Sequence, residues 1–513
     1  MTEPRRTRTA VGPQQTLLAI LLLPLIAGGA AAQTESLEAE QPTFTPVAPL
    51  GETIIARPGA GAVLDLRACL EQALAGNDSL LAERERRAEL EGQKYQALST
   101  GLPSVDLVGD WTRRRDPSFA LDPTFGGGEQ GMLSAPPGAD PWFDDFLAGF
   151  GSFIPAPENI PAATYWTTHF DLNWEINPVK IIGAVGAANL GLERQDLLIR
   201  AAEHATAVNV IASYHVIISL AEAVNALEAQ YANQRELLEL TKMRYDLGFA
   251  TRLDTLQAAV ALANIEPNLR DFRQRVATAG SRLNAVMGRD PARPITIRNQ
   301  DFLEDDAIDR EGALDLATTR PELEAIDRFV GMLERQRQVQ GADMLPYLSF
   351  FGSYGWVGTD FSSQWDDGHE SWTAAAALNI PLFNGLFTKG QVDQTSAQIR
   401  RTEYELSGFR RQAQVQVLQL INQLETAREN LRAADLNLER AEEALAESQL
   451  MYRLGKANYL DVLNADADHL TARRNVIAAR FDVLTLTANL KRAVGASPLT
   501  PLAAISGLVA ADR

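Results

Sequence analysis

One structural unit occurs twice in this chain, and each copy holds an apolar repeat too long for a compact domain. A Tyr-x-Leu-Gly-x-Ala-x2-Leu-Asp-x-Leu pattern begins at Tyr245 and again at Tyr452, 207 positions later. Before each pattern, apolar residues recur every seven positions, from Val210 and from Val417. Heptad spacing predicts long helices that pack as coiled coils. Each copy is expected to contain a short helix, helix, strand, loop, strand, very long helix, tight turn and long helix.

The length of the predicted helices is itself a constraint. The segment from Ile181 to Leu247 would extend about 100 Å as a helix, at ~1.5 Å per residue. The heptads alone would fit an ordinary solvent-exposed coiled coil equally well. The residue pattern of the predicted strands is therefore needed to distinguish a soluble coiled coil from a membrane protein.

Alternation within the predicted strands favours the membrane protein. From Trp166 to Ile176 the even positions carry Trp, Thr, Phe, Leu, Trp and Ile, whereas the odd positions carry Thr, His, Asp, Asn and Glu. A strand of about eleven residues with one apolar face is typical of a membrane-spanning barrel. Strands are expected near residues 104–112, 165–176, 347–357 and 372–381. Aromatic residues gather at membrane interfaces, which is the expected place of Trp111, Trp166, Trp174, Trp356 and Trp372.

Four strands are too few to close a barrel by themselves. An open sheet edge in lipid would leave backbone N–H and C=O groups without partners. The smallest known barrels have about eight strands, and side chains fill the interior of a barrel that small. A conducting pore therefore needs at least three copies of the chain.

The N-terminus has the pattern of a secretory signal peptide. Arg5, Arg6 and Arg8 precede an apolar segment from Leu17 to Ile26, and small residues at Ala30–Ala32 fit a cleavage site. No other segment is expected to be apolar enough for a transmembrane helix. An exported protein without a helical span is predicted.

Composition argues against an enzyme and against a nucleic-acid partner. The net charge of −19 leaves no basic patch to neutralise phosphates. The five histidines are scattered, and no H-E-x-x-H, G-x-S-x-G or P-loop motif occurs. We expect no catalytic residues, no metal site and no cofactor. The only cysteine, Cys69, is expected in the core because it shares a helical face with Leu66, Leu70 and Ala73.

Taken together, these features resemble the TolC family of outer-membrane efflux proteins. The resemblance covers Leu64 to Pro498 and rests on the duplicated unit, the Pro-Leu-Phe-Asn-Gly run at Pro381–Gly385 and the two Tyr-x-Leu-Gly turns. It implies a membrane α+β fold: a trimeric 12-stranded β-barrel, with four strands from each protomer, continuous with a long periplasmic α-helical coiled-coil barrel. The implied location is the cell outer membrane, in contact with its lipid.

The resemblance also implies a function and partners. The chain would form a homotrimer that serves as the passive exit duct of a tripartite efflux pump or a type I secretion system. A periplasmic adaptor (membrane fusion) protein and an inner-membrane transporter of the RND or ABC class would open it. The alternative is a structural or adhesive surface coiled coil with a barrel as its anchor, which needs neither the duplication nor the matched turns.

The organisation implied by the resemblance has six parts. They are a signal peptide at 1–32, a flexible periplasmic segment at 33–63, a first repeat at 64–288, a connector at 289–310, a second repeat at 311–497 and a C-terminal tail at 498–513. Pro267 lies in the helix that returns from the first turn and predicts a kink or break there.

Particular residues acquire roles by the same resemblance. The periplasmic mouth would close through rings of aspartates and through a link between Tyr452 and Asp254. Asp461 matches the first ring position, and Asn464 stands where the family has a second aspartate. Ala457 stands where the family has an arginine, so one closing contact is expected to be missing. Simpler roles remain open, because aspartates also stabilise helix N-termini and glycines cap helix C-termini. The tips that an adaptor would grip are Leu247, Gly248 and Phe249, and Leu454, Gly455 and Lys456.

Overall fold

The computed structural model describes residues 52–59, 62–115, 140–143, 145–146, 162–300, 308–498 and 500. The expected signal peptide, most of the segment at 33–63 and nearly all of the C-terminal tail lie outside these residues.

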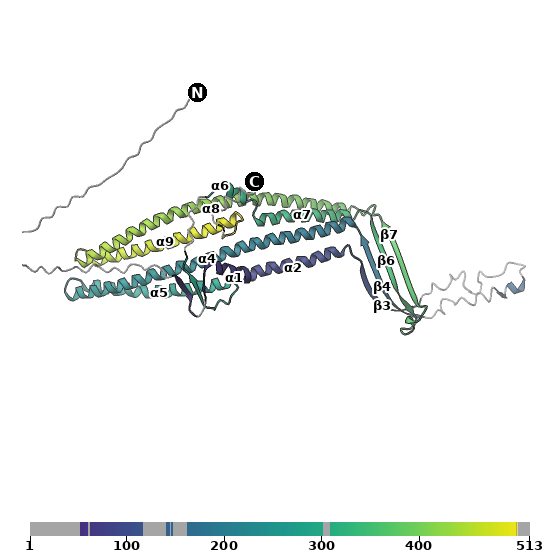
Figure 1. The fold of residues 1–513 in the computed structure, drawn as a ribbon, viewed down its shortest axis with the longest axis horizontal. Coiled ribbons are helices and arrows are strands. Elements are labelled where there is room, and N and C mark those ends of the chain that lie inside the picture. The colour runs from purple at the N-terminus through teal and green to yellow at the C-terminus, as the bar shows by residue number, and fades with distance from the viewer. Residues whose placement is uncertain are drawn as a thin grey trace, which may run out of the picture. The chain divides into compact units, whose positions relative to one another are not determined.

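Long helices make up most of the described chain (Figure 1). The first group is α1 (Leu66–Gly76), α2 (Asp78–Ser99), α4 (Pro178–Asp246) and α5 (Arg252–Val286). The second group is α6 (Arg310–Leu316), α7 (Pro321–Ala342), α8 (Phe387–Arg453) and α9 (Tyr459–Ala493). With 69 and 67 residues, α4 and α8 each extend about 100 Å at ~1.5 Å per residue. The very long helices that the heptads predict are therefore confirmed.

Four antiparallel strands form one sheet in the order β3-β4-β6-β7. They are β3 (Ser104–Arg114), β4 (Ala163–Ile176), β6 (Tyr347–Gly358) and β7 (Glu370–Asn379). The register places Trp111 opposite Trp166 and Asp106 opposite Asp171. Since side chains alternate between the two faces of a strand, one face of the sheet carries most of the large apolar residues and the other carries Asp106, Asp171 and Glu175. The alternation seen in β4 thus continues into β3 and much of β6, whereas Glu370 of β7 lies opposite Trp356 on the apolar face.

The two outer strands of this sheet each have a single neighbour. β3 pairs only with β4, and β7 pairs only with β6, within the part of the chain that the structure describes. Each therefore has one edge of backbone N–H and C=O groups that no other strand of the same chain covers.

A second, smaller sheet was not predicted. β1 (Thr53–Arg57) pairs antiparallel with β5 (Ile295–Arg298), and β2 (Val63–Leu64) pairs parallel with β5. The flexible segment expected at 33–63 is thus a strand in the part described, and the connector at 289–310 contains one too. Ile54 and Ile297 are buried in a core that includes α1, α4 and α5. Strands this short offer too few alternating positions to be recognised in the sequence.

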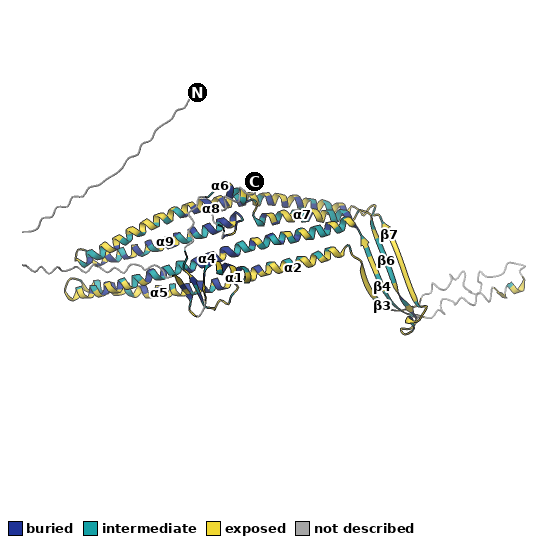
Figure 2. Cartoon of the chain, in the orientation of Figure 1, coloured by how far each residue is buried: buried dark blue, intermediate teal, exposed yellow. Residues whose placement is uncertain are grey.

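Two other expectations about the helices, a break at Pro267 and the absence of another strongly apolar helix, are wrong. α5 is continuous from Arg252 to Val286, with Pro267 on its exposed side, where water can satisfy the carbonyl that proline leaves without a donor. A kink at Pro267 stays a prediction. α4 contains an 18-residue window apolar enough to cross a membrane, 44% of it buried. α4 packs against α2, α5, α7 and α9, and a helix surrounded by other helices is apolar for that reason. Figure 2 shows the contrast with α2, which is largely exposed.

Cys69 lies in the core, as expected, beside Leu66, Leu70 and Ala73. Burial, and secondarily the charge of Asp65, raises the pKa of its thiol to about 12. The thiolate is the reactive form of cysteine. We therefore predict that near pH 8 a thiol reagent modifies the folded protein about a thousandfold more slowly than the unfolded chain. Mass spectrometry of timed samples measures this, and similar rates in both states would show that Cys69 is accessible.

Candidate functional site

The two hairpins end in turns of the same geometry. Gly248 and Gly455 have φ values of +80° and +74°, which glycine adopts without strain. The N–H of Phe249 donates to the carbonyl of Arg244 at 2.8 Å, and Lys456 makes the matching bond to Met451 at 2.8 Å. This hydrogen-bond pattern is the Schellman motif. Both glycines are therefore helix C-caps, in line with the simpler of their two expected roles.

The side chains around these glycines point into solvent. Phe249 is 74% exposed, and Leu247 and Leu454 are more than half exposed; Lys456 is also exposed. Sequence analysis missed three more exposed apolar residues that follow the first tip along α5: Leu253, Leu256 and Val260. Their spacing of three and four places them on one helix face. An exposed apolar group of this kind is typical of an interaction surface.

Asp254 and Asp461 occupy equivalent positions at the starts of α5 and α9. The carboxylate of Asp254 accepts the backbone N–H of Thr251 at 2.8 Å, and that of Asp461 accepts the N–H of Asn458 at 3.0 Å. The cap side chains reciprocate, so each pair forms a capping box. Asp461 is exposed, and Asn464 is exposed one turn later. The two residues proposed for the ring therefore share an accessible side of α9.

Tyr452 makes different contacts from those expected. Its hydroxyl lies 3.0 Å from the hydroxyl of Thr241, and the Arg244 guanidinium donates to its carbonyl and lies 4.6 Å from its ring centre. Tyr452 is only 3% exposed. Asp254 is meanwhile bonded to Thr251. The expected hydrogen bond between Tyr452 and Asp254 is thus not formed within the chain.

An arginine does meet Tyr452, although it comes from α4. The arginine contact was expected to be absent because Ala457 occupies the position of the family's arginine. Arg244, in the last turn of α4, contacts Tyr452 of α8. Both hairpins then contribute to one apolar cluster: Leu237, Leu238, Ala258, Tyr452, Tyr459 and Val462. The two hairpins are therefore packed together near their tips.

The tryptophans of the sheet fall into two groups along the strands. Trp111, Trp166, Trp356 and Trp372 lie at the strand ends farther from the helices, where Trp111 and Trp166 have ring centres 6.3 Å apart. Trp174 lies at the other end, two residues before β4 finishes. Its indole N–H donates to the carbonyl of Gly101 at 2.9 Å. Two separated aromatic groups are consistent with two membrane interfaces, which remains a prediction for these residues.

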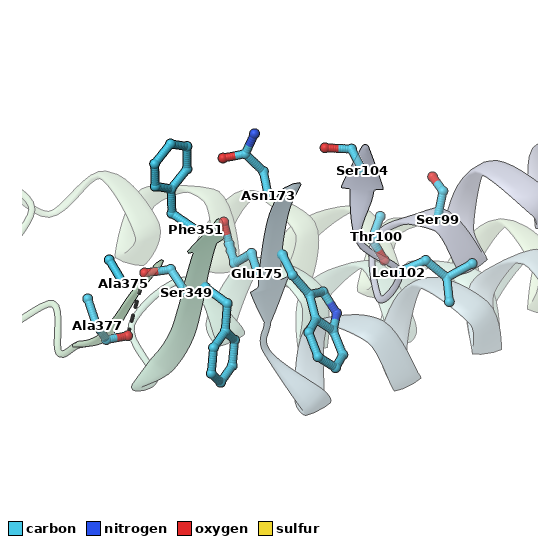
Figure 3. A pocket seen from close by; sticks show the side chains of 12 residues that line it. Ser99, Thr100, Leu102, Ser104, Asn173, Glu175, Ser349, Phe351, Ala375 and Ala377 are labelled. Atoms are coloured by element: carbon cyan, nitrogen blue, oxygen red, sulfur yellow. Dashed lines mark hydrogen bonds between the residues drawn. The ribbon is translucent and has the colours of Figure 1, made fainter. Parts of the chain in front are cut away.

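A recess of about 480 Å³ lies where the sheet meets the helices (Figure 3). Ser104, Asn173 and Phe351 point to the same side of the sheet. Glu175 of β4 also lines the recess, opposite Ser349 of β6. The polar face of the sheet is therefore hollowed at its helix-proximal end.

Comparisons with known proteins agree with this architecture. Residues 161–289 and 315–496, more than half of the chain, match the family described as outer membrane efflux protein. The alkaline protease secretion protein AprF of Pseudomonas aeruginosa is 25% identical over 297 residues, which cover 55% of this chain and 60% of AprF. The outer membrane efflux protein BepC of Brucella suis is 23% identical over 350 residues, covering 67% of this chain and 76% of BepC.

A solved structure shows the same fold. The outer membrane protein VceC of Vibrio cholerae superposes with a TM-score of 0.66 at 19% identity, over 84% of this chain and 96% of VceC. The resemblance expected from the sequence is confirmed. The chain therefore belongs to the outer membrane efflux protein family, a family of channel proteins, and resides in the cell outer membrane with its long helices in the periplasm.

Proposed function

We propose that this chain is the protomer of a passive trimeric exit duct, which carries the cargo of a tripartite efflux pump or a type I secretion system across the outer membrane. The observation that carries the proposal is the four-stranded sheet with one apolar face and two open edges. In lipid both edges need partners. Three copies supply twelve strands, which are enough to enclose an open lumen. Two copies would supply only eight, and side chains fill the interior of an eight-stranded barrel.

The polar face of the sheet supports a water-filled interior. Asp106 and Asp171 lie directly opposite each other on the face away from the large apolar side chains. Carboxylates side by side are costly in a dry interior because each disfavours the charge of the other. They are tolerated where water reaches them, as in the lumen of a duct.

The helices support the remaining part of the proposal. Only Asn177 separates the end of β4 at Ile176 from the start of α4 at Pro178, and α4 continues without interruption to the first tip at Leu247. A duct built on such helices extends from the membrane deep into the periplasm. Its exposed tips, with Phe249 and Leu454, would bind a periplasmic adaptor, which links the duct to an inner-membrane transporter. Asp461 would form a ring of three carboxylates at the mouth, with Asn464 one turn further in.

Two measurements on the purified protein test the proposal. Light scattering in detergent should give the mass of a trimer, and the trimer should conduct ions when it is inserted into a planar bilayer. A stable monomer or dimer would exclude the architecture. A trimer without conductance would instead favour the barrel-anchored adhesive coiled coil.

A further inference from the structure

The first hairpin (α4 and α5) meets the second hairpin (α8 and α9) along a seam, formed by the contacts of α4 with α8 and α9. Near the tips this seam contains Thr241 with Tyr452, and an ion pair of Glu236 with Arg453 at 2.7 Å. Farther from the tips, a groove of about 340 Å³ lies between α4, α5 and α9. The seam is therefore closely packed near the tips and hollowed farther from them.

Between the tips and this groove, the seam contains a buried carboxylate. Asp466 of α9 is 4% exposed. Its Oδ2 accepts two hydrogen bonds from α4, one from the amide of Gln230 at 2.9 Å and one from the amide of Gln234 at 2.8 Å. The Tyr459 hydroxyl lies 3.5 Å from the Gln234 carbonyl oxygen. Gln230 and Gln234, one turn apart on the first hairpin, thus both donate a hydrogen bond to the same carboxylate oxygen of the second hairpin.

Both hydrogen-bond donors to Asp466 are neutral amides. A buried carboxylate without a directly bonded cation is costly, because neutral dipoles replace only part of its hydration. Burial accordingly raises the pKa of Asp466, and the two glutamines and the charge of His469 offset this only in part. The closed seam therefore favours the protonated form of Asp466.

His469 lies one turn beyond Asp466 on α9 and responds in the opposite sense. It is 8% exposed, and burial lowers its pKa, while the charges of Glu442 and Asp466 counteract this. Nε2 of His469 lies 3.7 Å from Glu442 of α8, which also faces Arg473 at 3.7 Å. The closed seam therefore favours neutral His469.

The groups around this pair come from α4, α8 and α9. α5 contributes Ala258 and Leu262 to the neighbouring apolar cluster, which contains Tyr452 and Tyr459. The polar groups are Gln230 and Gln234 from α4, Glu442 and Tyr452 from α8, and Tyr459 and Arg473 from α9. Burial and the neighbouring Asp466 raise the pKa of Tyr459 to about 12, so it stays neutral. Asp466 and His469 are the groups here whose shifted pKa values favour their neutral forms and that change charge in mild acid.

On the basis of the proposed duct, we propose that Gln230, Gln234 and Asp466 form a proton-sensitive latch between the two hairpins, and that Asp466 and His469 act on it in opposite directions. Parting the hairpins exposes both side chains to water. Hydrated Asp466 returns towards its ordinary pKa of 3.8 and releases a proton. Hydrated His469 returns towards 6.5 and takes one up. The opening equilibrium then depends on pH through both residues.

Asp466 and His469 change the stability of the closed latch in opposite directions as the pH changes. Asp466 stabilises the closed latch most below pH 3.8, and this contribution is lost as the pH rises through its raised pKa. His469 stabilises the closed latch above pH 6.5, and this contribution is lost as the pH falls through its lowered pKa. In the parent protein the two contributions oppose each other in mild acid. Removing one of them should reveal the other.

Single-channel recordings between pH 4 and pH 8 test the latch. Asp466→Asn keeps the shape and an acceptor for the glutamines, so only His469 remains and acidification should raise the open fraction. His469→Gln leaves only Asp466, so acidification should lower it. Asp468→Asn, an exposed carboxyl of the same helix, is the matched control and should behave as the parent. The double variant Gln230→Ala, Gln234→Ala removes both hydrogen bonds that join the hairpins at Asp466, so it should raise the open fraction about tenfold at neutral pH.

The outcomes separate the latch from the duct. If the parent conducts but both single variants keep its pH response, the latch is wrong and the duct stands. If the parent trimer does not conduct, the duct itself fails. Should Asp466→Asn not assemble, Gln230→Glu tests the same contact, because two adjacent carboxyls share a proton. Acidification should then close the channel more strongly than in the parent, and a pH response identical to that of the parent would overturn the latch.

Discussion

Replacing Asp461 with alanine should remove most of the block that multivalent cations exert on the channel from the periplasmic side. In the proposed trimer three copies of this exposed carboxylate surround the mouth. Each one raises the cost of ionising the others, and a bound cation relieves that repulsion. The blocking concentration of a divalent or trivalent cation should rise about tenfold or more in Asp461→Ala, since the ring loses all its charge. Acidification should weaken the block of the parent for the same reason.

The duplicated hairpin offers a matched control for this experiment. Asp254→Ala removes the equivalent capping box from α5, so it should cost the same helix-end stability, about 1 kcal/mol. Because Asp254 is not bonded to Tyr452 within the chain, this variant should keep the parent's cation block. Asn464→Asp should tighten the block if that side of α9 faces the lumen. An Asp461→Ala channel that is blocked as tightly as the parent would place the constriction elsewhere.

Placing a charged side chain at either tip glycine should abolish export while leaving the trimer intact. Gly248 has open space where a side chain would begin, and at Gly455 the nearest atom is an Arg244 nitrogen at 3.7 Å. A glutamate therefore fits sterically, and the left-handed backbone adds only ~1–2 kcal/mol of strain. Its charge would lie beside the exposed Phe249 and Leu454, where an adaptor would need an apolar surface. Export should fall below a tenth of the parent level, since burying a charge in an apolar contact is costly.

The control separates the charge from the backbone strain. Asparagine tolerates the left-handed conformation better than other residues, so Gly248→Asn and Gly455→Asn should retain most of the export activity. Secreted cargo or drug resistance measures export, and light scattering measures assembly. Glutamate variants that export normally would show that these glycines serve only as helix caps.

Local patterns in the sequence were sufficient for the main elements. Heptads ending in Tyr-x-Leu-Gly predicted where α4 and α8 finish, because a glycine cap acts on its own helix end. The alternation from Trp166 to Ile176 predicted β4, because the side-chain period of a strand is two. The strand expected at 104–112 is observed as Ser104–Arg114. All these features depend on residues close together in the chain.

Contacts between distant segments were not predictable in the same way. Tyr452 meets Thr241 and Arg244 from a helix about two hundred residues earlier, and the alternative partner, Asp254, satisfies its carboxylate within its own turn. Asp466 gave no signal, because an aspartate on a helical rod usually faces solvent. Which side chain occupies a seam depends on how two helices are rotated against each other, and heptad spacing alone does not determine that.

The open edges of β3 and β7 have a consequence for biogenesis. In the proposed trimeric duct, a single chain cannot enter the membrane with its sheet exposed to lipid at both sides, so newly exported chains would have to find one another first. The rate of insertion should therefore depend steeply on how many copies are present in the periplasm. A cell that makes few copies should accumulate chains that wait outside the membrane, where chaperones and proteases reach them, and a small rise in expression should yield a disproportionate gain in finished ducts.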